Sequence, residues 1–252
     1  MAAAYDTYDY PNYWVGREYE HEAEVLAIKE FLAKIPQIGT ILEIGAGFGR
    51  LTPIYAFRAK RVILADPSAK LLKSASQSFE NSKKIEFVQS KIENLSSKIR
   101  RNSIDVVFIV RVLHHLQDID SVFKLTRRLL KKGGYLILEF PNKKHIKASF
   151  SEFFRGNFTF PIDIFPKDIR TKRSQNKGTL PFFNYHPEIL IHKLESTGFE
   201  IIEKRSVSNI RSKSAKALLS TNTLLTLERL LQRPLSYINF GPSIFVLAQR
   251  TN

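Results

Sequence analysis

The sequence predicts an α/β protein built on one mostly parallel sheet, and two observations carry this prediction. Short apolar runs bounded by turn residues recur along the middle of the chain. The segments between the early runs have the spacing of helices, and strands that alternate with helices form parallel sheets joined by right-handed crossovers. The 252 residues suffice for a full core. We therefore expect one domain over residues 1–252.

The strands are expected at the apolar runs, which lie at 40–45, 61–66, 84–89, 104–110, 134–140, 199–205 and 243–249. Helices are expected at 68–80, 119–131 and 186–198. The second of these is followed by a Gly-Gly pair that suits a helix C-terminus. Pro187 suits the first turn of the third.

Three further segments lie outside this alternation. Residues 1–35 are expected to form an N-terminal helical cap. Residues 141–183 form an insertion that we interpret as a lid. Residues 206–242 form a second insertion with an amphipathic helix over 215–232. Insertions of this size in a compact domain usually carry function or disorder.

Composition excludes several classes of protein. The chain has no cysteine, which excludes disulfides, thiolate metal sites and a cysteine nucleophile, and we expect no metal site. No signal-peptide pattern and no apolar run of membrane-spanning length occur, so a cytoplasmic location is expected. The net charge of +15 favours an anionic partner, namely nucleic acid, an acidic membrane surface or an acidic substrate, or else reflects a lysine-rich surface that keeps the protein in solution.

The stretch TILEIGAGFGRLTP, residues 40–53, places three glycines in five positions after the first strand. A turn of this kind lets the backbone approach a ligand and presents amides to it. The glycines are Gly45, Gly47 and Gly49, so the third is one residue too early for the dinucleotide fingerprint, and Arg50 takes its place. No Gly-Lys-Ser/Thr follows, which excludes a phosphate-binding loop of the Walker type.

Two acids accompany the glycine turn. Glu43 lies inside the apolar strand, where a carboxylate suits a cationic ligand better than a pyrophosphate. Asp66 ends the second strand, where a carboxylate can accept hydrogen bonds from both hydroxyls of a ribose. S-adenosylmethionine carries positive charge and a ribose but no phosphate. The acids and the glycines together therefore predict an S-adenosylmethionine site.

The motifs ILEIGAGFGRL, VILADPS, FVQSKIENL, DVVFIVRVLHHLQD and LKKGGYLILEFPN resemble, in order and spacing, those of class I S-adenosylmethionine-dependent methyltransferases. The resemblance covers about residues 12–141, and more weakly 183–205 and 243–249, and it is to the broad small-molecule branch. It implies a Rossmann-like, seven-stranded, mostly parallel sheet with an antiparallel last strand and helices on both faces. It also implies that the cofactor lies over the C-terminal ends of the first strands.

The resemblance assigns the methionine and ribose portion of the cofactor to the glycine turn. Gly45, Ala46, Gly47 and Gly49 would wrap this portion. Glu43 would orient it, often through water.

For the rest of the nucleoside, the resemblance gives the ribose hydroxyls to Asp66 and places Pro67 and Ser68 beside the adenine. Lys91 stands where the family usually has an aspartate that contacts the adenine amino group. Lysine cannot accept that hydrogen bond. Ile92 would then serve through its backbone and by packing.

Three residues are candidates for the cofactor's carboxylate. Arg111 ends the fourth strand and either meets the methionine carboxylate or reaches solvent. Tyr13 and Arg17 belong to YPNYWVGREYE, which resembles a family segment that folds over the cofactor. The alternative for this segment is a tyrosine-rich helix start that packs on the domain.

Methyl transfer is an in-line displacement, so positioning of the acceptor supplies much of the catalysis. A base is needed only where the acceptor must lose a proton. His115, after the fourth strand, is the candidate catalytic residue, with His114 beside it, and a structural role at a helix start is the alternative. Tyr185 and His186 are weaker candidates of the same kind.

The expected acceptor is a small apolar or aromatic molecule. The fourth strand is followed by VRVLHH rather than by Asn/Asp-Pro-Pro-aromatic, which in this family argues against adenine, cytosine and glutamine amines. Without cysteine the covalent route to 5-methylcytosine is closed. Six phenylalanines of the 141–183 insertion either line the acceptor pocket or form a small core of their own.

Other partners stay open at this point. Nine lysines and arginines lie between residues 143 and 177, against three acids, and suit an anionic acceptor or membrane headgroups. Bases interleaved with aromatics also occur in proteins that bind single-stranded nucleic acid, so an RNA methyltransferase is the alternative enzyme. A non-catalytic S-adenosylmethionine-binding module is the alternative outside enzymes, supported by Lys91 and Arg111.

Overall fold

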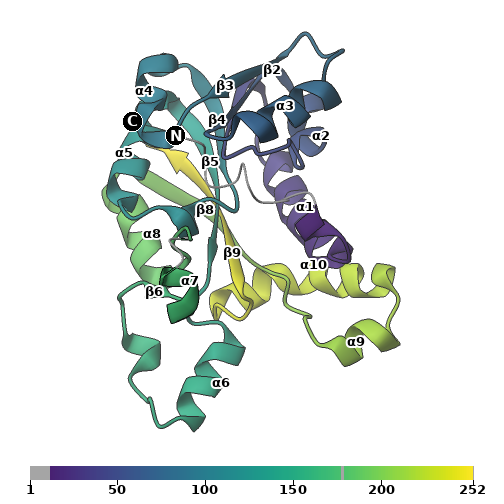
Figure 1. Cartoon of the computed structure of the whole chain (residues 1–252), viewed down its shortest axis with the longest axis vertical. Helices are drawn as coiled ribbons and strands as arrows, with labels where there is room; N and C mark the ends of the chain where they lie inside the picture. The colour runs from purple at the N-terminus through teal and green to yellow at the C-terminus, as the bar shows by residue number, and fades with distance from the viewer. Residues whose placement is uncertain (1–11, 177–178, 252) are drawn as a thin grey trace.

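The computed structural model describes residues 12–176 and 179–251, and a sheet of seven strands runs through the middle of this part of the chain (Figure 1). The strand order is β3-β2-β1-β4-β5-β9-β8. The strands are β1 (Ile38–Ile44), β2 (Ala59–Asp66), β3 (Ile85–Gln89), β4 (Ile104–Ile109), β5 (Leu130–Pro141), β8 (Phe199–Val207) and β9 (Ser243–Arg250). Strands β1 to β5 pair in parallel, and β9 is antiparallel to both β5 and β8. The predicted sheet, with its antiparallel last strand, is confirmed.

Helices cover both faces of this sheet. The α-helices are α1 (Glu18–Ala33), α2 (Thr52–Tyr55), α3 (Ala69–Ser78), α4 (Leu95–Lys98), α5 (Ile119–Leu129), α6 (Ile146–Phe154), α7 (Lys172–Asn176), α8 (Pro187–Ser196), α9 (Lys213–Leu218) and α10 (Thr221–Tyr237). Short 3₁₀ helices are η2 (Asn12–Trp14), η3 (Ala56–Arg58), η4 (Ile92–Asn94), η5 (Leu113–His115) and η6 (Phe160–Ile162). Helices α5 and α8 lie on one side of the sheet and α1 and α3 on the other (Figure 1).

Two hydrophobic cores lie on the two faces, and alternate residues of one strand supply both. Ile41 of β1 packs in the core with Phe31 of α1, whereas its neighbour Leu42 packs in the core with Phe123 of α5 and Leu194 of α8. Successive side chains of a strand point to opposite faces, so a strand covered on both faces must be apolar throughout. This explains why the strands are visible in the sequence as continuous apolar runs.

The Gly-Gly pair that follows the 119–131 segment does not end a helix. Helix α5 already ends at Leu129, and β5 begins at Leu130. Gly133, with φ of +72°, lies inside β5 where the pairing with β4 shifts register. The glycines therefore permit a bulge in a strand, and the sequence-based position of the helix end is corrected here.

The N-terminal and second insertions meet on one side of the sheet. Helix α1 contacts α10, where Gln232 Nε2 donates to the Ala23 carbonyl oxygen at 2.8 Å. The amphipathic segment expected over 215–232 is divided into α9 and α10, because the Ser220 side chain caps a new helix by accepting from the Thr223 amide at 3.2 Å. Residues 1–11 of the expected cap lie outside the described residues.

The 141–183 insertion contains α6, η6, α7 and the two short strands β6 (Lys167–Asp168) and β7 (Phe183–Asn184), which pair with one another. Its root is fixed to the loop before β9, because Asn142 Nδ2 donates to the carbonyl oxygens of Asn239 and Gly241 at 2.6 and 2.7 Å. Residues 177–178 lie outside the described part. Among the helices described, none has the length and apolar character needed to cross a membrane.

Candidate functional site

The glycine turn joins β1 to α2 and is held against two other loops. Gly45, Gly47 and Gly49 have φ values of +73°, +56° and +81°, which side chains rarely adopt. The Gly45 amide donates to the Ala65 carbonyl oxygen at the end of β2. A Cβ built on Gly45 would lie 2.2 Å from Cγ2 of Val112, directly before η5. The glycines are therefore required both by the backbone and by the close approach of the loop after β4.

Asp66 faces this turn from the end of β2. Its Oδ2 accepts from the Gly47 amide at 2.9 Å, and its Oδ1 accepts from the Ser68 amide at 2.8 Å. Ser68 itself is fully buried, and its Oγ caps α3 by accepting from the Leu71 amide. The structure thus brings Asp66 and the glycine turn together, as the sequence-based hypothesis requires.

Glu43 lies behind the turn rather than at its surface. The carboxylate accepts from the Tyr55 hydroxyl, and Thr52 Oγ1 donates to it at 3.4 Å. Burial raises the pKa of Glu43 to about 7, although the bond from Tyr55 opposes this rise. The contacts that the structure shows brace α2 behind the turn, and the orientation of a cofactor by Glu43 stays a prediction.

The loop after β3 carries the residues that the sequence analysis expects near the adenine. Lys91 is exposed and directly precedes η4, whereas Ile92 is buried in the core beneath. The Ser90 amide donates to the Asp66 carbonyl oxygen at 3.0 Å, so this loop lies beside the end of β2. Pro67 lies between Asp66 and Ser68 in the chain and is half-buried. Contacts of these residues with adenine stay predictions.

A buried acid that the sequence analysis missed joins two arginines beside the turn. Glu24 of α1 is 2 % exposed and lies 2.6 Å from Nη2 of Arg50 and 3.3 Å from Nε of Arg111. The sequence indicates that Glu24 is buried, because it lies on the same apolar face of the helix as Ala27, Ile28 and Phe31. Arg111 therefore does not simply reach solvent.

Aromatic rings of the segment before α1 pack on these cations. The Arg50 guanidinium lies 3.6 Å from the Trp14 ring centroid, and that of Arg17 lies 4.2 Å from the Tyr13 ring centroid. The Arg111 guanidinium lies 5.0 Å from the Trp14 ring centroid. Cation–π contacts of this kind stabilise an aromatic segment over a charged surface. The segment with Tyr13 and Arg17 thus lies at the glycine turn.

Glu139 at the end of β5 holds Arg111 in a strained conformation. Arg111 has φ of +62°, and its amide donates to Glu139 Oε2 at 2.9 Å. Ser243 Oγ donates to the other carboxylate oxygen at 2.5 Å, and burial raises the pKa of Glu139. Strain of this kind clusters at functional sites. The sequence analysis did not identify Glu139, although Glu139 is an acid inside an apolar run, as Glu43 is.

His115 lies on η5 and contacts the end of the 141–183 insertion. Its Nδ1 lies 2.6 Å from the Pro181 carbonyl oxygen. A carbonyl can only accept, so Nδ1 carries the proton and Nε2 has the lone pair of the neutral ring. Burial lowers the pKa of His115 and lowers that of His114 well below its usual value, so both rings are neutral at pH 7.

Tyr185 and His186 hold the end of the insertion through contacts with backbone carbonyl oxygens. The Tyr185 hydroxyl lies 2.9 Å from the Leu116 carbonyl oxygen, and burial raises its pKa. His186 Nε2 lies 3.1 Å from the Pro161 carbonyl oxygen. These contacts give both side chains a structural role.

The six phenylalanines between residues 150 and 165 are not gathered around the glycine turn. Phe160 is buried, but the other five, Phe150, Phe153, Phe154, Phe158 and Phe165, each expose more than half of their surface. Helix α6 extends from the lower end of the molecule, well apart from α2 (Figure 1). Neither an enclosed acceptor pocket nor a small core, apart from Phe160, is formed by them.

Comparison with known proteins agrees with this geometry. Residues 42–138 match the family described as "Methyltransferase domain". Phosphoethanolamine N-methyltransferase 1 of Triticum aestivum is 35 % identical over 115 residues, which cover 43 % of this chain and 23 % of that protein. Ubiquinone biosynthesis O-methyltransferase of Nitrosomonas europaea is 30 % identical over 105 residues, 41 % of this chain and 44 % of that protein. The matched segment thus spans less than half of either relative.

Among solved structures, an S-adenosylmethionine-dependent methyltransferase of Archaeoglobus fulgidus superposes with a TM-score of 0.57 and 19 % identity, over 96 % of this chain and all of that one. The sheet order, with the glycine turn facing Asp66, is the fold of the S-adenosylmethionine-dependent methyltransferases. Within this fold, residues 42–138 form a methyltransferase domain of the matched family.

Proposed function

We propose that this protein binds S-adenosylmethionine at the glycine turn and transfers its methyl group to a small-molecule acceptor beside His115. The observation that carries the proposal is the meeting of three loops at the carboxyl edge of the sheet. Asp66 bonds to Gly47 across the turn, and Gly45 lies against Val112, three residues before His115. Ligands of open α/β sheets bind at this edge.

The residues present suit the donor. A carboxylate accepts several hydrogen bonds at once, so Asp66 can serve the ribose hydroxyls while it holds the turn. Gly45 has no Cβ, so the turn can lie directly against Val112. A Cβ at this position would overlap the Val112 side chain and displace the turn from the site. Arg17, Arg50 and Arg111 supply cations for the donor's carboxylate, with Glu24 balancing part of their charge. When bound, the donor supplies an electrophilic methyl group on a sulfonium.

His115 would take the acceptor's proton. The contact between Nδ1 and Pro181 leaves the Nε2 lone pair as the basic position, and the lowered pKa keeps that position unprotonated at pH 7. A second observation bears on the acceptor, because the Phe182 ring lies 5.9 Å from that of His115 and 4.2 Å from that of His114. An aromatic wall beside the base favours an apolar or aromatic acceptor with a hydroxyl or amine.

Binding of the donor is tested by calorimetry with S-adenosylmethionine, S-adenosylhomocysteine and NAD. The two adenosyl ligands should bind and NAD should not. Asp66→Ala should weaken binding by ten- to a hundredfold, corresponding to about 1.5–3 kcal/mol. Glu86→Ala is the matched control, because it removes an exposed acid from the neighbouring strand β3. Tight NAD binding, or unchanged binding by a folded Asp66→Ala, would contradict the proposed site.

Transfer is tested by release of S-adenosylhomocysteine with a panel of phenols, catechols, amines and short RNAs. His115→Gln should lower kcat for a hydroxyl acceptor by about 10²–10⁴-fold and leave donor affinity unchanged. The wild-type rate should fall as the pH is lowered through the His115 pKa, which lies below its usual 6.5, and the variant should lose this dependence. Donor binding without turnover of any acceptor would support a binding module, and turnover of RNA alone would overturn the small-molecule assignment.

A further inference from the structure

Helix α6 has an apolar face that the described chain covers only in part. Ile146, Phe150, Phe153 and Phe154 follow the i, i+4, i+7, i+8 pattern of an amphipathic helix, yet no residue of α6 is buried. Phe154 is 81 % exposed. In a globular protein such a face normally packs on the core. Here the Phe153 ring meets the Phe158 ring of the following loop, with ring centroids 5.2 Å apart, and all four side chains stay more than a third exposed.

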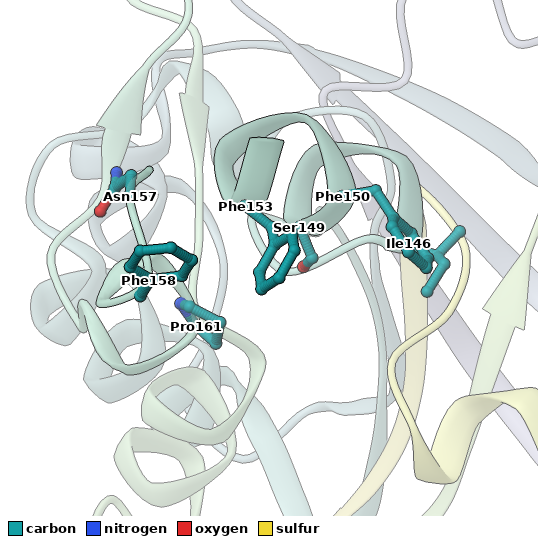
Figure 2. A pocket seen from close by; sticks show the side chains of 7 residues that line it. All are labelled: Ile146, Ser149, Phe150, Phe153, Asn157, Phe158 and Pro161. Atoms are coloured by element: carbon teal, nitrogen blue, oxygen red, sulfur yellow. The ribbon is translucent and has the colours of Figure 1, made fainter. Parts of the chain in front are cut away.

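Exposed apolar side chains of the following loop extend this face. Together they form what we call the phenylalanine surface, defined as Phe150, Phe153, Phe154, Phe158, Ile162, Ile164 and Phe165. Figure 2 shows part of it, an open groove of about 270 Å³ between α6 and the loop. An apolar patch of this extent marks an interaction site.

The loop is held in this exposed position by a buried cation. Lys143, at the end of β5, is 1 % exposed, and its Nζ donates to the carbonyl oxygens of Asp163 and Phe165 at 2.8 and 2.7 Å. The same nitrogen lies 2.6 Å from Asp163 Oδ2. Phe160 packs beneath the loop, with the ammonium groups of Lys143 and Lys167 5.6 and 5.2 Å from its ring centroid. These contacts fix the loop from inside, so the exposure outside is a feature of the fold.

The insertion that carries the phenylalanine surface has an excess of positive charge. Each of the three acids of the insertion is already paired, Glu152 with Lys167, Asp163 with Lys143 and Asp168 with Arg170. Lys147, Lys172 and Arg173 are exposed and form no ion pair within the described residues. The whole chain carries +15.

We propose that the phenylalanine surface inserts into the interface of an anionic lipid bilayer, with the exposed lysines and arginines of the same 141–183 segment at the headgroups. Apolar rings on one face with bases around them have the composition of interfacial amphipathic segments, and bases near an anionic leaflet are attracted to it. This membrane binding goes beyond the proposed methyl transfer and does not depend on it, because α6 lies well apart from α2 and the glycine turn (Figure 1).

Two other occupants fit the same surface less well. A second copy of the chain would bring its own charge of +15 against these lysines and arginines. In RNA binding, nucleobases stack on free aromatic faces, but the Phe153 ring contacts both Phe154 and Phe158, with ring centroids 5.7 and 5.2 Å apart. Isoleucines offer no stacking face. Arg170, which a continuous basic stripe would need, is bound to Asp168.

The test is flotation of the full chain with vesicles of phosphatidylglycerol and phosphatidylcholine, and with phosphatidylcholine alone, at about 150 mM salt. The wild type should bind the anionic vesicles. The double variant Phe154→Ser, Phe165→Ser should bind at least tenfold more weakly, and so should Lys172→Glu, Arg173→Glu. Phe57→Ser is the matched control, because Phe57 is equally exposed on η3, outside the insertion. It should bind like the wild type.

Circular dichroism of each variant checks that it is folded. The proposal is overturned if the wild type does not bind anionic vesicles, or if the folded double variant binds them as tightly as Phe57→Ser. It is equally overturned if the double variant instead loses self-association seen by analytical ultracentrifugation, or loses binding to a single-stranded RNA, while vesicle binding is unchanged. Equal binding to neutral and anionic vesicles would contradict the role of the bases.

Discussion

Two surfaces of this chain, the glycine turn and the phenylalanine surface, depart from ordinary packing in opposite ways. At the glycine turn, charged side chains are buried, as Glu24, Glu43 and Glu139 show. On the phenylalanine surface, large apolar side chains are exposed. Buried charge and exposed apolar patches are the observations that carry information, since the reverse arrangement is the usual one.

The difference lies in where the compensating partner is found. Each buried acid has its partner inside the chain, namely the arginines for Glu24, Tyr55 for Glu43 and the Arg111 amide for Glu139. Burial of these charges is thus offset by hydrogen bonds that also fix the loops of the site. The exposed phenylalanines contact one another but lie outside the hydrophobic cores of the described chain, and we therefore propose a partner outside it.

The largest effect is expected at Gly45. In Gly45→Ala, the new Cβ would lie 2.2 Å from the stiff side chain of Val112, so the turn must move. We expect donor affinity, measured by calorimetry, to fall at least a hundredfold. Gly156→Ala is the matched control, because Gly156 has a similar φ of +78° and nothing within 4 Å. Both variants should lose about 1 kcal/mol of stability from the left-handed backbone, and equal donor affinity in the two would refute the steric argument.

Removal of one buried acid is expected to act on the stability of the protein, whereas Gly45→Ala acts mainly on donor affinity. Glu24→Gln removes the buried anion that Arg50 and Arg111 share, and we expect the free energy of unfolding in urea to fall by about 3 kcal/mol. Glu86→Gln breaks the half-exposed pair with Arg61 and should cost less than about 1 kcal/mol. Similar losses in both variants would show that burial of the charge at the glycine turn has no special weight.

The sequence predicts several of the residues at the glycine turn, but it does not predict which residues they contact in the fold. Glu43 and the glycines were found because an acid interrupts an apolar run, and Glu139 carries the same signal in LILEF. What a periodic pattern cannot give is the neighbour across the fold. The left-handed Arg111 depends on Glu139, which is 28 residues away in the chain.

In the 141–183 insertion, too, the sequence predicts local structure but not tertiary contacts. The spacing of Ile146, Phe150, Phe153 and Phe154 predicts one apolar helix face, and no local pattern tells whether another part of the chain covers it. For the same reason the six phenylalanines were interpreted as a pocket or a core. Their exposure is a tertiary fact.

A smaller effect, and a pH-dependent one, is expected at Glu43. Its pKa rises from 4.5 to about 7 on folding, so the folded state binds the proton more tightly and this stabilisation is present below pH 4.5 and lost as the pH rises through 7. The unfolding free energy of Glu43→Gln relative to the wild type should therefore rise by about 2 kcal/mol between pH 5 and pH 8. Denaturation at several pH values measures this.

The control for Glu43 is Glu86→Gln. Arg61 lowers the pKa of Glu86 below 4.5, so both states are ionised above pH 5 and the difference from wild type should stay constant between pH 5 and pH 8. A constant difference for Glu43→Gln as well would mean that its carboxyl is ionised in the folded protein.

The smallest effect is expected on the phenylalanine surface, and its smallness is the point of the comparison. Phe154→Ser removes a ring that is 81 % exposed, so the unfolding free energy should change by less than about 0.5 kcal/mol. Phe160→Ala, in the same insertion, removes a ring that is 3 % exposed and should cost about 3 kcal/mol. Thermal and urea unfolding of the two variants decide the matter. If Phe154→Ser were as costly as Phe160→Ala, the ring would be packed on this chain in solution, and the contrast with the buried acids would disappear.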